Sequence, residues 1–417
     1  MIQGWKQAYW SLTDYIKSNP SINIEPAVTA IPPDVRPGFY AVFDQVREAF
    51  IVDNFKDELD AAKNLSREYK QLAGDIVSIM DIQPEIELNP RLKWLMDDPL
   101  NGLMRLIYSP LFDLLKGKLD EEEFVQTCHV EFGSVFDDLY RKGFNLWVIL
   151  ALLELFEPSE LMWVPQKEPN AINSLKELYK QGARVEPIPD ITHTSLLSFE
   201  PGTWDTFIVP DIVFYSAKLN KYVAMRRSLP VNTNEPYLVA KQRTSEREWL
   251  SFRQLSRIFN LANHWPDILI YCAEKPQTLN LIADFDYLLR PDMAIDTFNQ
   301  YSSFNAGEAG RIRSHQQHLK PFKGTTVLYQ NNIPDEAVKA FSPDEPGNSP
   351  LPVTSSTSSS VSTPIECFGQ ETGTVPEIAA SIQATEDEAS AMLSTITLMT
   401  SRGFNRQSLS QIVDGLI

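Results

Sequence analysis

The sequence predicts an α+β protein, and three of its features support that fold class. Residues 1–160 repeat apolar side chains at three- and four-residue spacing, which is typical of a helical domain whose helices bury one face. Residues 161–341 alternate short β-like runs with helical ones, which predicts a mixed-sheet α/β domain. Residues 342–374 are rich in Ser, Thr and Pro, which predicts a disordered linker. A chain of 417 residues has room for two or three domains.

The N-terminal region is expected to contain several amphipathic helices. Apolar stripes run through residues 39–51 and 59–80. Asp120 followed by Glu123 has the pattern of a capping box, in which each residue bonds the backbone N–H of the other. This pair predicts that a helix begins at residue 121 and continues to about residue 141.

The middle region is expected to alternate strands and helices. Two strands flank a helix, and then come a hairpin, a third strand, an amphipathic helix and a fourth strand. These elements are predicted at Met162–Pro165, 170–181, Ala183–Ile188, Thr206–Tyr215, Tyr222–Arg226, Tyr237–Gln242, Ser245–Asn263 and Asp267–Cys272. Two strands, a polar helix and a last strand follow at Leu279–Phe285, Met293–Phe298, 305–319 and 324–329. β-Branched and aromatic residues mark the strands.

Residues 375–417 are predicted to form a C-terminal amphipathic helical hairpin. Its apolar side chains recur at helical spacing and would line one face of each helix. Two such short helices cannot bury enough apolar surface alone, so the hairpin is expected to dock on the chain itself or on a partner. The side chains expected to bind a partner are Met392, Ile396, Leu409, Ile412, Val413 and Leu416.

Charge and cysteine content favour an acidic cytoplasmic protein. The net charge of −18 disfavours non-specific binding to nucleic acid or to an anionic membrane. The three cysteines are far apart and form no CxxC pair, which favours a reducing compartment. The N-terminal residues lack the pattern of a signal peptide. The longest apolar run, residues 144–156, is shorter than the about 20 residues of a membrane span, so it is interpreted as a buried helix.

Residues 206–272 combine Pro210-Asp211 at the start of a predicted hairpin with Lys241 in the third predicted strand. In its order of strands and helix, this segment resembles the restriction-endonuclease-like core of the PD-(D/E)XK nuclease superfamily. The resemblance implies that Asp211, Glu235 and Lys241 are catalytic and that Mg²⁺ or Mn²⁺ is the cofactor. In such sites the carboxylates concentrate the metal, which together with the lysine stabilises charge on the attacked phosphate. Val239 stands where the family has an acid, so Glu235 would have to supply that carboxylate.

A group of basic residues interrupts the acidic sequence and predicts a surface that binds phosphate or an acidic partner. Residues 1–160 hold 15 Lys and Arg against 27 Asp and Glu, whereas residues 161–340 hold 20 against 19. The arginines expected to bind are Arg226, Arg227, Arg243, Arg247, Arg253, Arg257, Arg311 and Arg313. The alternative interpretation is that these arginines pair with the acidic parts of the same chain.

Acidic residues between 284 and 296 form a second candidate for cation binding. Asp284, Asp286 and Asp292, with Asp296 nearby, offer the oxygen ligands that a hard cation prefers. The alternative is that they cap a turn between two strands. His315 and His318 have the spacing of two metal ligands on one helix, but no third ligand is visible and the helix is polar, so a solvated helix face is the favoured interpretation.

These patterns support a non-enzymatic cytoplasmic interaction or assembly protein as the first hypothesis. It would use a charge-segregated surface and a tethered C-terminal module to hold a protein partner or another copy. No P-loop, GxGxxG, GxSxG or HExxH motif is present, and no cofactor is expected. The alternative is a diverged PD-(D/E)XK-like nuclease, or a nucleic-acid-binding protein, centred on residues 205–257.

Overall fold

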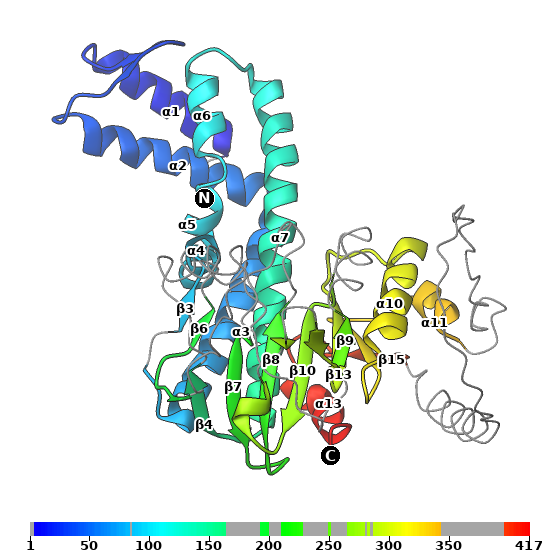
Figure 1. The fold of residues 1–417 in the computed structure, drawn as a ribbon. Helices are drawn as coiled ribbons and strands as arrows, with labels where there is room; N and C mark the ends of the chain where they lie inside the picture. Colours follow the sequence, from blue (N-terminus) through cyan, green and yellow to red (C-terminus); the bar gives the residue numbers. More distant parts are fainter. Residues whose placement is uncertain are drawn as a thin grey trace, which may run out of the picture.

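The computed structural model confirms an α+β protein, in which long helices pack against one mixed sheet (Figure 1). The structure describes residues 4–83, 86–163, 192–199, 210–227, 249–251, 265–279, 282–283, 287–342 and 396–417. The elements predicted at 170–181, 183–188 and 237–242 lie outside these residues, as does nearly all of the predicted linker.

The N-terminal region is helical, as the apolar stripes predict. Its helices are α1 (Trp5–Ser18), α2 (Arg36–Asn54), α3 (Lys56–Met80), α4 (Pro90–Asp97), α5 (Pro99–Met104), α6 (Tyr108–Leu115) and α7 (Glu121–Leu155). The two short helices α4 and α5 each begin with a proline after a capping side chain, from Asn89 and Asp98 respectively. Proline is suited to that first position because its missing N–H would have no partner there.

Helix α7 connects the N-terminal helices to the sheet along the length of the molecule (Figure 1). Its capping box is formed as predicted, with the Asp120 carboxylate accepting from the N–H of Glu123 and the Glu123 carboxylate accepting from the N–H of Asp120. The helix runs for 35 residues, through the predicted 121–141 helix and on through the apolar run. Its C-terminal half is buried on all sides because it lies between α3 and the sheet.

One sheet organises the rest of the described chain, with its strands in the order β15-β14-β13-β10-β8-β7-β4-β5. The strands are β4 (Pro158–Trp163), β5 (Thr192–His193), β7 (Ile212–Ser216), β8 (Lys221–Arg227), β10 (Ile268–Ala273), β13 (Met293–Phe298), β14 (Thr325–Tyr329) and β15 (Ile396–Thr400). Pairing is antiparallel from β5 to β13 and parallel from β13 to β15. Helix α10 (Ala306–Leu319) joins β13 to β14, as a parallel connection requires.

The predicted hairpin, the strands near 267–272, 293–298 and 324–329, and the helix at 305–319 are thereby confirmed where the structure describes them.

Short elements complete the described chain. They are β1 (Asn23–Ile24), β2 (Thr29–Ala30), β3 (Glu87–Leu88), β6 (Ser198–Phe199), β9 (Trp249–Ser251), β11 (Ile282–Ala283), β12 (Tyr287–Leu289), η2 (Pro276–Leu279), α11 (Asp335–Ala340), η3 (Arg406–Leu409) and α13 (Ser410–Asp414). The prediction of a helix over 245–263 is wrong at β9, which pairs antiparallel with β12. Backbone pairing with a distant strand outweighs the local helical pattern there.

The apolar core is continuous across residue 160. One cluster of buried side chains begins at Trp5, passes through α7 and the sheet, and ends at Leu416. The two regions predicted from composition therefore share one core, and α7 contributes to both. Among the described helices, none has the length and apolar character to cross a membrane.

The predicted C-terminal helical hairpin is wrong where the structure describes it. Residues 396–400 form strand β15, which adds to the open edge of β14, and only the short η3 and α13 follow. The sequence ITLMT is rich in β-branched residues, which suit a strand once an edge is available. The side chains expected to bind a partner, Leu409, Ile412, Val413 and Leu416, are instead buried in the chain's own core. Met392 lies outside the described residues.

Candidate functional site

Asp211, the predicted catalytic aspartate, lies at the entrance to strand β7 and is buried. Its Oδ1 is 3.1 Å from Nη1 of Arg226 and 2.9 Å from Nη2 of Arg227, both on the neighbouring strand β8. The backbone N–H of Arg227 donates to Oδ2 at 2.5 Å. The antiparallel register, in which Asp211 also donates its own N–H to the carbonyl of Met225, brings these groups together.

This arrangement makes Asp211 an anion that the chain itself neutralises. Burial alone would raise the pKa of the carboxyl group, but the two guanidinium groups and the N–H of Arg227 outweigh it and lower the pKa. Only 1% of the Asp211 side chain is exposed, and only 2% of the Arg226 side chain. Arg227 is more open, and its guanidinium lies 5.3 Å from the centre of the Phe199 ring.

The predicted partners of Asp211 cannot be located relative to it. Glu235 and Lys241 lie outside the described residues, as do Arg243, Arg247, Arg253 and Arg257. The catalytic set and most of the phosphate-binding surface therefore stay predictions. Of the arginines expected to bind phosphate, Arg226 and Arg227 contact Asp211, and Arg313 donates to the carbonyl of Ala340 at 2.6 Å.

The predicted cation site at residues 284–292 is described only at Asp292. Its Oδ2 accepts from the backbone N–H of Cys272 at 2.6 Å, so it ties the end of β10 to the start of β13. Asp284 and Asp286 lie outside the described residues. Within the described part of the chain, no group of three His, Cys, Asp or Glu side chains is placed to hold a metal ion.

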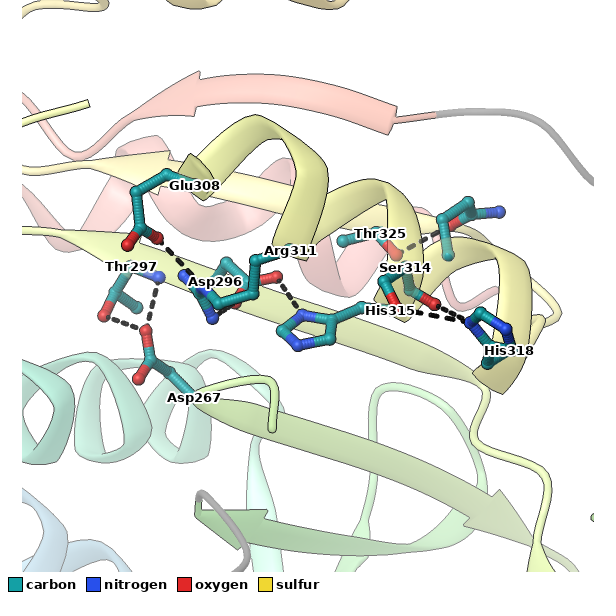
Figure 2. Close-up of polar contacts among 10 residues, drawn as sticks. Asp267, Asp296, Thr297, Glu308, Arg311, Ser314, His315, His318 and Thr325 are labelled. Atoms are coloured by element: carbon teal, nitrogen blue, oxygen red, sulfur yellow. Dashed lines mark hydrogen bonds and ion pairs between the residues drawn. The ribbon is translucent and has the colours of Figure 1, made fainter. Parts of the chain in front are cut away.

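The most concentrated polar cluster centres on Asp296 in strand β13, beneath helix α10 (Figure 2). The Oδ1 atom of Asp296 is 2.7 Å from Nη1 of Arg311, and its Oδ2 is 2.9 Å from Nδ1 of His315. Because a carboxylate only accepts, Nδ1 of His315 carries the proton that it donates. Arg311 in turn bonds Glu308 at 2.8 Å. Asp296 and His315 are both fully buried.

Helix α10 positions these partners by its spacing and its cap. Asn305 accepts the N–H of Glu308 and begins the helix. Arg311 and His315 are four residues apart, so they occupy one face of the helix, and that face lies on β13. His318 does not join His315, because its Nδ1 lies 2.8 Å from the carbonyl oxygen of Ser314. The two histidines therefore bond different groups, and His315 is buried rather than on the solvated face that the sequence favours.

A second carboxylate, Asp267, lies near Asp296, at the start of the neighbouring strand β10 (Figure 2). Its Oδ2 accepts from the backbone N–H of Thr297 at 2.8 Å and from the Thr297 hydroxyl at 2.9 Å. The same hydroxyl bonds Asn145 of α7, so Thr297 faces that helix. Neighbouring residues of a strand point to opposite faces, which places the Asp296 side chain toward α10 and the Thr297 hydroxyl toward α7.

The electrostatics of the cluster hold Asp296 ionised. Burial opposes ionisation, but His315 and Arg311 together lower the pKa of Asp296. Burial would also lower the pKa of Arg311, whereas Asp296, Asp267 and Glu308 raise it. Each carboxylate oxygen of Asp296 already accepts from Arg311 or His315, which weakens the attraction of this group for a divalent cation.

Sequence reasoning identified these residues separately and did not bring them together. Asp267 is predicted only as the first residue of a strand, and Arg311 is assigned to a binding surface. One signal in the sequence could have identified this cluster. Arg311 and His315 are four residues apart on a predicted helix, and that helix directly follows the predicted strand that contains Asp296. Comparisons with protein-family models, with curated proteins and with solved structures find no match for this chain.

Proposed function

We propose that this chain is a non-enzymatic interaction protein, built on a sheet whose nuclease-like acidic positions are neutralised by its own cations. The observation that carries the proposal is the pairing of both Asp296 oxygens, one with Arg311 and one with His315. Asp211 repeats the same arrangement with Arg226 and Arg227. A carboxylate held in this way contributes to the fold rather than to metal binding.

The strand order supports a relationship to nuclease-like cores, but with later strands of the chain matched to the core than the ones predicted. Strands β8, β10 and β13 form an antiparallel meander, and α10 then leads to the parallel strand β14. With this matching, Pro266-Asp267 begins the second strand and Asp296 lies in the third. Phe298 stands two residues after Asp296, where the family motif has its lysine.

The geometry of these matched residues supports binding rather than hydrolysis. Two carboxylates that share a metal must converge on one point, at about 2.0–2.6 Å from it. Asp267 and Asp296 are instead each bonded to donors of the chain itself, Asp267 to Thr297 and Asp296 to Arg311 and His315. The uneven distribution of charge, acidic over residues 1–160 and nearly balanced over 161–340, supports recognition of a partner by charge. A cytoplasmic location is part of this proposal.

A cleavage assay tests the proposal. Single-stranded DNA, duplex DNA and RNA are each incubated with the full chain and Mg²⁺ or Mn²⁺, with a chelator control. No cleavage above that control is expected. Metal-dependent cleavage that is abolished by Asp267→Asn or Lys241→Ala, but not by Asp138→Asn on the exposed surface of α7, would overturn the proposal.

The second candidate function is a metal-dependent nuclease, favoured by that same strand order. Arg311 keeps 11% of its side chain exposed and Glu308 keeps 30%, so the α10 side of the cluster reaches the surface. A substrate phosphate that attracts Arg311 would release one oxygen of Asp296 for a metal. In this case cleavage should appear in the assay above, and Arg311→Gln should change its metal requirement.

A further inference from the structure

The C-terminal segment, residues 396–417, docks in a groove between the edge of β14 and the C-terminal half of α7. Strand β15 pairs in parallel with β14 over five residue pairs, from Thr325 opposite Ile396 to Tyr329 opposite Thr400. After the strand the chain turns at Arg402 and Gly403, both of which have positive φ angles. Helix α13 then lies beside α7, where Figure 1 shows it next to the C-terminus.

Apolar contacts hold the segment in the groove. Phe404 packs edge-on against Trp147 of α7, with ring centres 5.1 Å apart. Leu409 and Val413 have no exposed surface, and they belong to the same core cluster as α7. Without residues 396–417, the apolar surface of the groove would therefore be left uncovered by the rest of the chain.

Charge complementarity fixes the position of the segment in the groove. Nη1 of Arg406 lies 2.6 Å from Asp75 of α3 and 2.9 Å from Glu154 of α7. Burial would lower the pKa of Arg406, but these two carboxylates raise it. Lys218, in the turn between β7 and β8, pairs with Asp414 at 2.6 Å. A cavity of 630 Å³ opens beside these pairs, with Glu157, Arg406 and Ser410 in its wall.

The connection between the groove and the segment is far longer than the fold requires. A parallel strand pair needs a crossover of about a dozen residues. Here roughly 50 residues separate Ser342 from Ile396, and their extended length would reach at most about 3.3–3.6 Å per residue. A connection of this length does not by itself confine the segment to the groove of its own chain.

We infer that the groove between β14 and α7 accepts residues 396–417 from a second copy of this chain, so that the protein self-associates by exchanging its C-terminal segments. The contacts are the same in the closed monomer and in the exchanged dimer, because both copies have one sequence. The equilibrium between closed monomer and exchanged dimer depends on two concentrations: that of the protein, and the effective concentration of the tethered segment at its own groove. The effective concentration is millimolar for short linkers and falls as the linker becomes longer. This inference rests on the proposed interaction function and identifies its partner.

A charge-swap experiment on the full chain tests exchange at micromolar concentration. Arg406→Glu repels the segment from its own groove, and Asp75→Lys with Glu154→Lys repels an unchanged segment. Each variant alone should be monomeric and less stable than the wild type. In the mixture, the segment with Arg406→Glu fits the lysine-bearing groove of the other chain, and a 1:1 dimer should appear by light scattering. A mixture that uses Arg402→Glu, at an exposed arginine of the same segment, should give no dimer.

The chain that carries all three substitutions completes the test. It should be monomeric and regain most of the wild-type stability, because its segment again matches its own groove. If it does so while the mixture yields no dimer, the segment docks only within its own chain and the inference is wrong. If neither segment exchange nor metal-dependent cleavage is observed, a second copy of the chain is not the partner, but the proposed non-enzymatic interaction function is not contradicted.

A cysteine trap gives a readout that does not depend on the charge swap. Lys218→Cys and Asp414→Cys are placed on separate chains, both with Cys367→Ser, and are equilibrated at hundreds of micromolar before treatment with a flexible bis-maleimide that links two cysteines. A crosslinked mixed dimer is expected. If both cysteines on one chain close readily but the mixture gives no crosslink, exchange does not occur.

Discussion

Asp211 and Arg226 face each other across the β7–β8 hairpin, with 3.1 Å between Oδ1 and Nη1 and with both side chains almost fully buried. Removing one partner of a buried ion pair leaves the other charge without compensation, which costs about 3–5 kcal/mol. Asp211→Asn should therefore lower the free energy of unfolding by that amount in urea denaturation. Asp138→Asn breaks an exposed pair with Lys142 and should change it by less than about 1 kcal/mol. Equal effects of the two substitutions would contradict the structural role of Asp211.

Acid should destabilise the protein through Asp211 and Asp296. Both carboxyl groups have a lowered pKa in the folded chain. A lowered pKa contributes stability that is fully present above the unfolded-state pKa, about 3.9 for Asp, and is lost as the pH falls below it. Urea unfolding between pH 7 and pH 3 should show a steep loss of stability below about pH 4. In Asp296→Asn that loss should be shallower, and an unchanged pH profile in this variant would count against the ion pairs.

Two glycines of α7 should respond in opposite ways to alanine. A Cβ atom at Gly143 would meet the methyl group of Met96 on α4 and, at 2.7 Å, a methyl group of Leu65 on α3, whereas at Gly133 no atom lies within 4 Å. Gly133→Ala should raise the free energy of unfolding by up to about 1 kcal/mol, because alanine favours the helix. Gly143→Ala should lower it by about 1–3 kcal/mol relative to Gly133→Ala, because α3 and α7 are overpacked. Similar effects at both positions would disprove the close approach of the two helices.

Cys128 should resist thiol reagents in the folded chain. It is buried in α7, and burial together with Glu131 raises the pKa of its thiol to about 12, so almost no thiolate is present at neutral pH. Modification with an alkylating reagent, mapped by mass spectrometry, should leave Cys128 unmodified until denaturant unfolds the protein. Rapid labelling of Cys128 without denaturant would show that this half of α7 opens under native conditions.

Local patterns in the sequence were sufficient for much of the fold. The capping box at Asp120 and Glu123 located the start of α7, and the alternating runs located β7, β8, β10, β13 and β14. Such signals depend only on neighbouring residues. The strand at 396–400 and the strand at 249–251 depend on edges supplied by distant parts of the chain, so a helical spacing of apolar residues predicted the wrong element for both.

The candidate site was harder to predict for the same reason. Asp211 was singled out for catalysis, but its partners Arg226 and Arg227 come from the pairing register of two strands, which sequence spacing alone does not specify. Asp296 meets Arg311 and His315 because α10 crosses back over β13. Asp267 bonds Thr297, the residue next to Asp296, and this proximity appears only once β10 and β13 are paired.

The central claim is that Arg311 and His315 neutralise Asp296, so that it does not bind a metal ion. Titration with Mn²⁺ tests this claim most directly, and electron paramagnetic resonance distinguishes free from protein-bound Mn²⁺. The wild-type chain and Asp296→Asn are each titrated with Mn²⁺ at neutral pH. The structure predicts that the two chains bind equally little, because Arg311 and His315 already occupy the Asp296 oxygens. A bound Mn²⁺ ion in the wild type that is lost in Asp296→Asn would contradict the account and favour a metal-dependent nuclease.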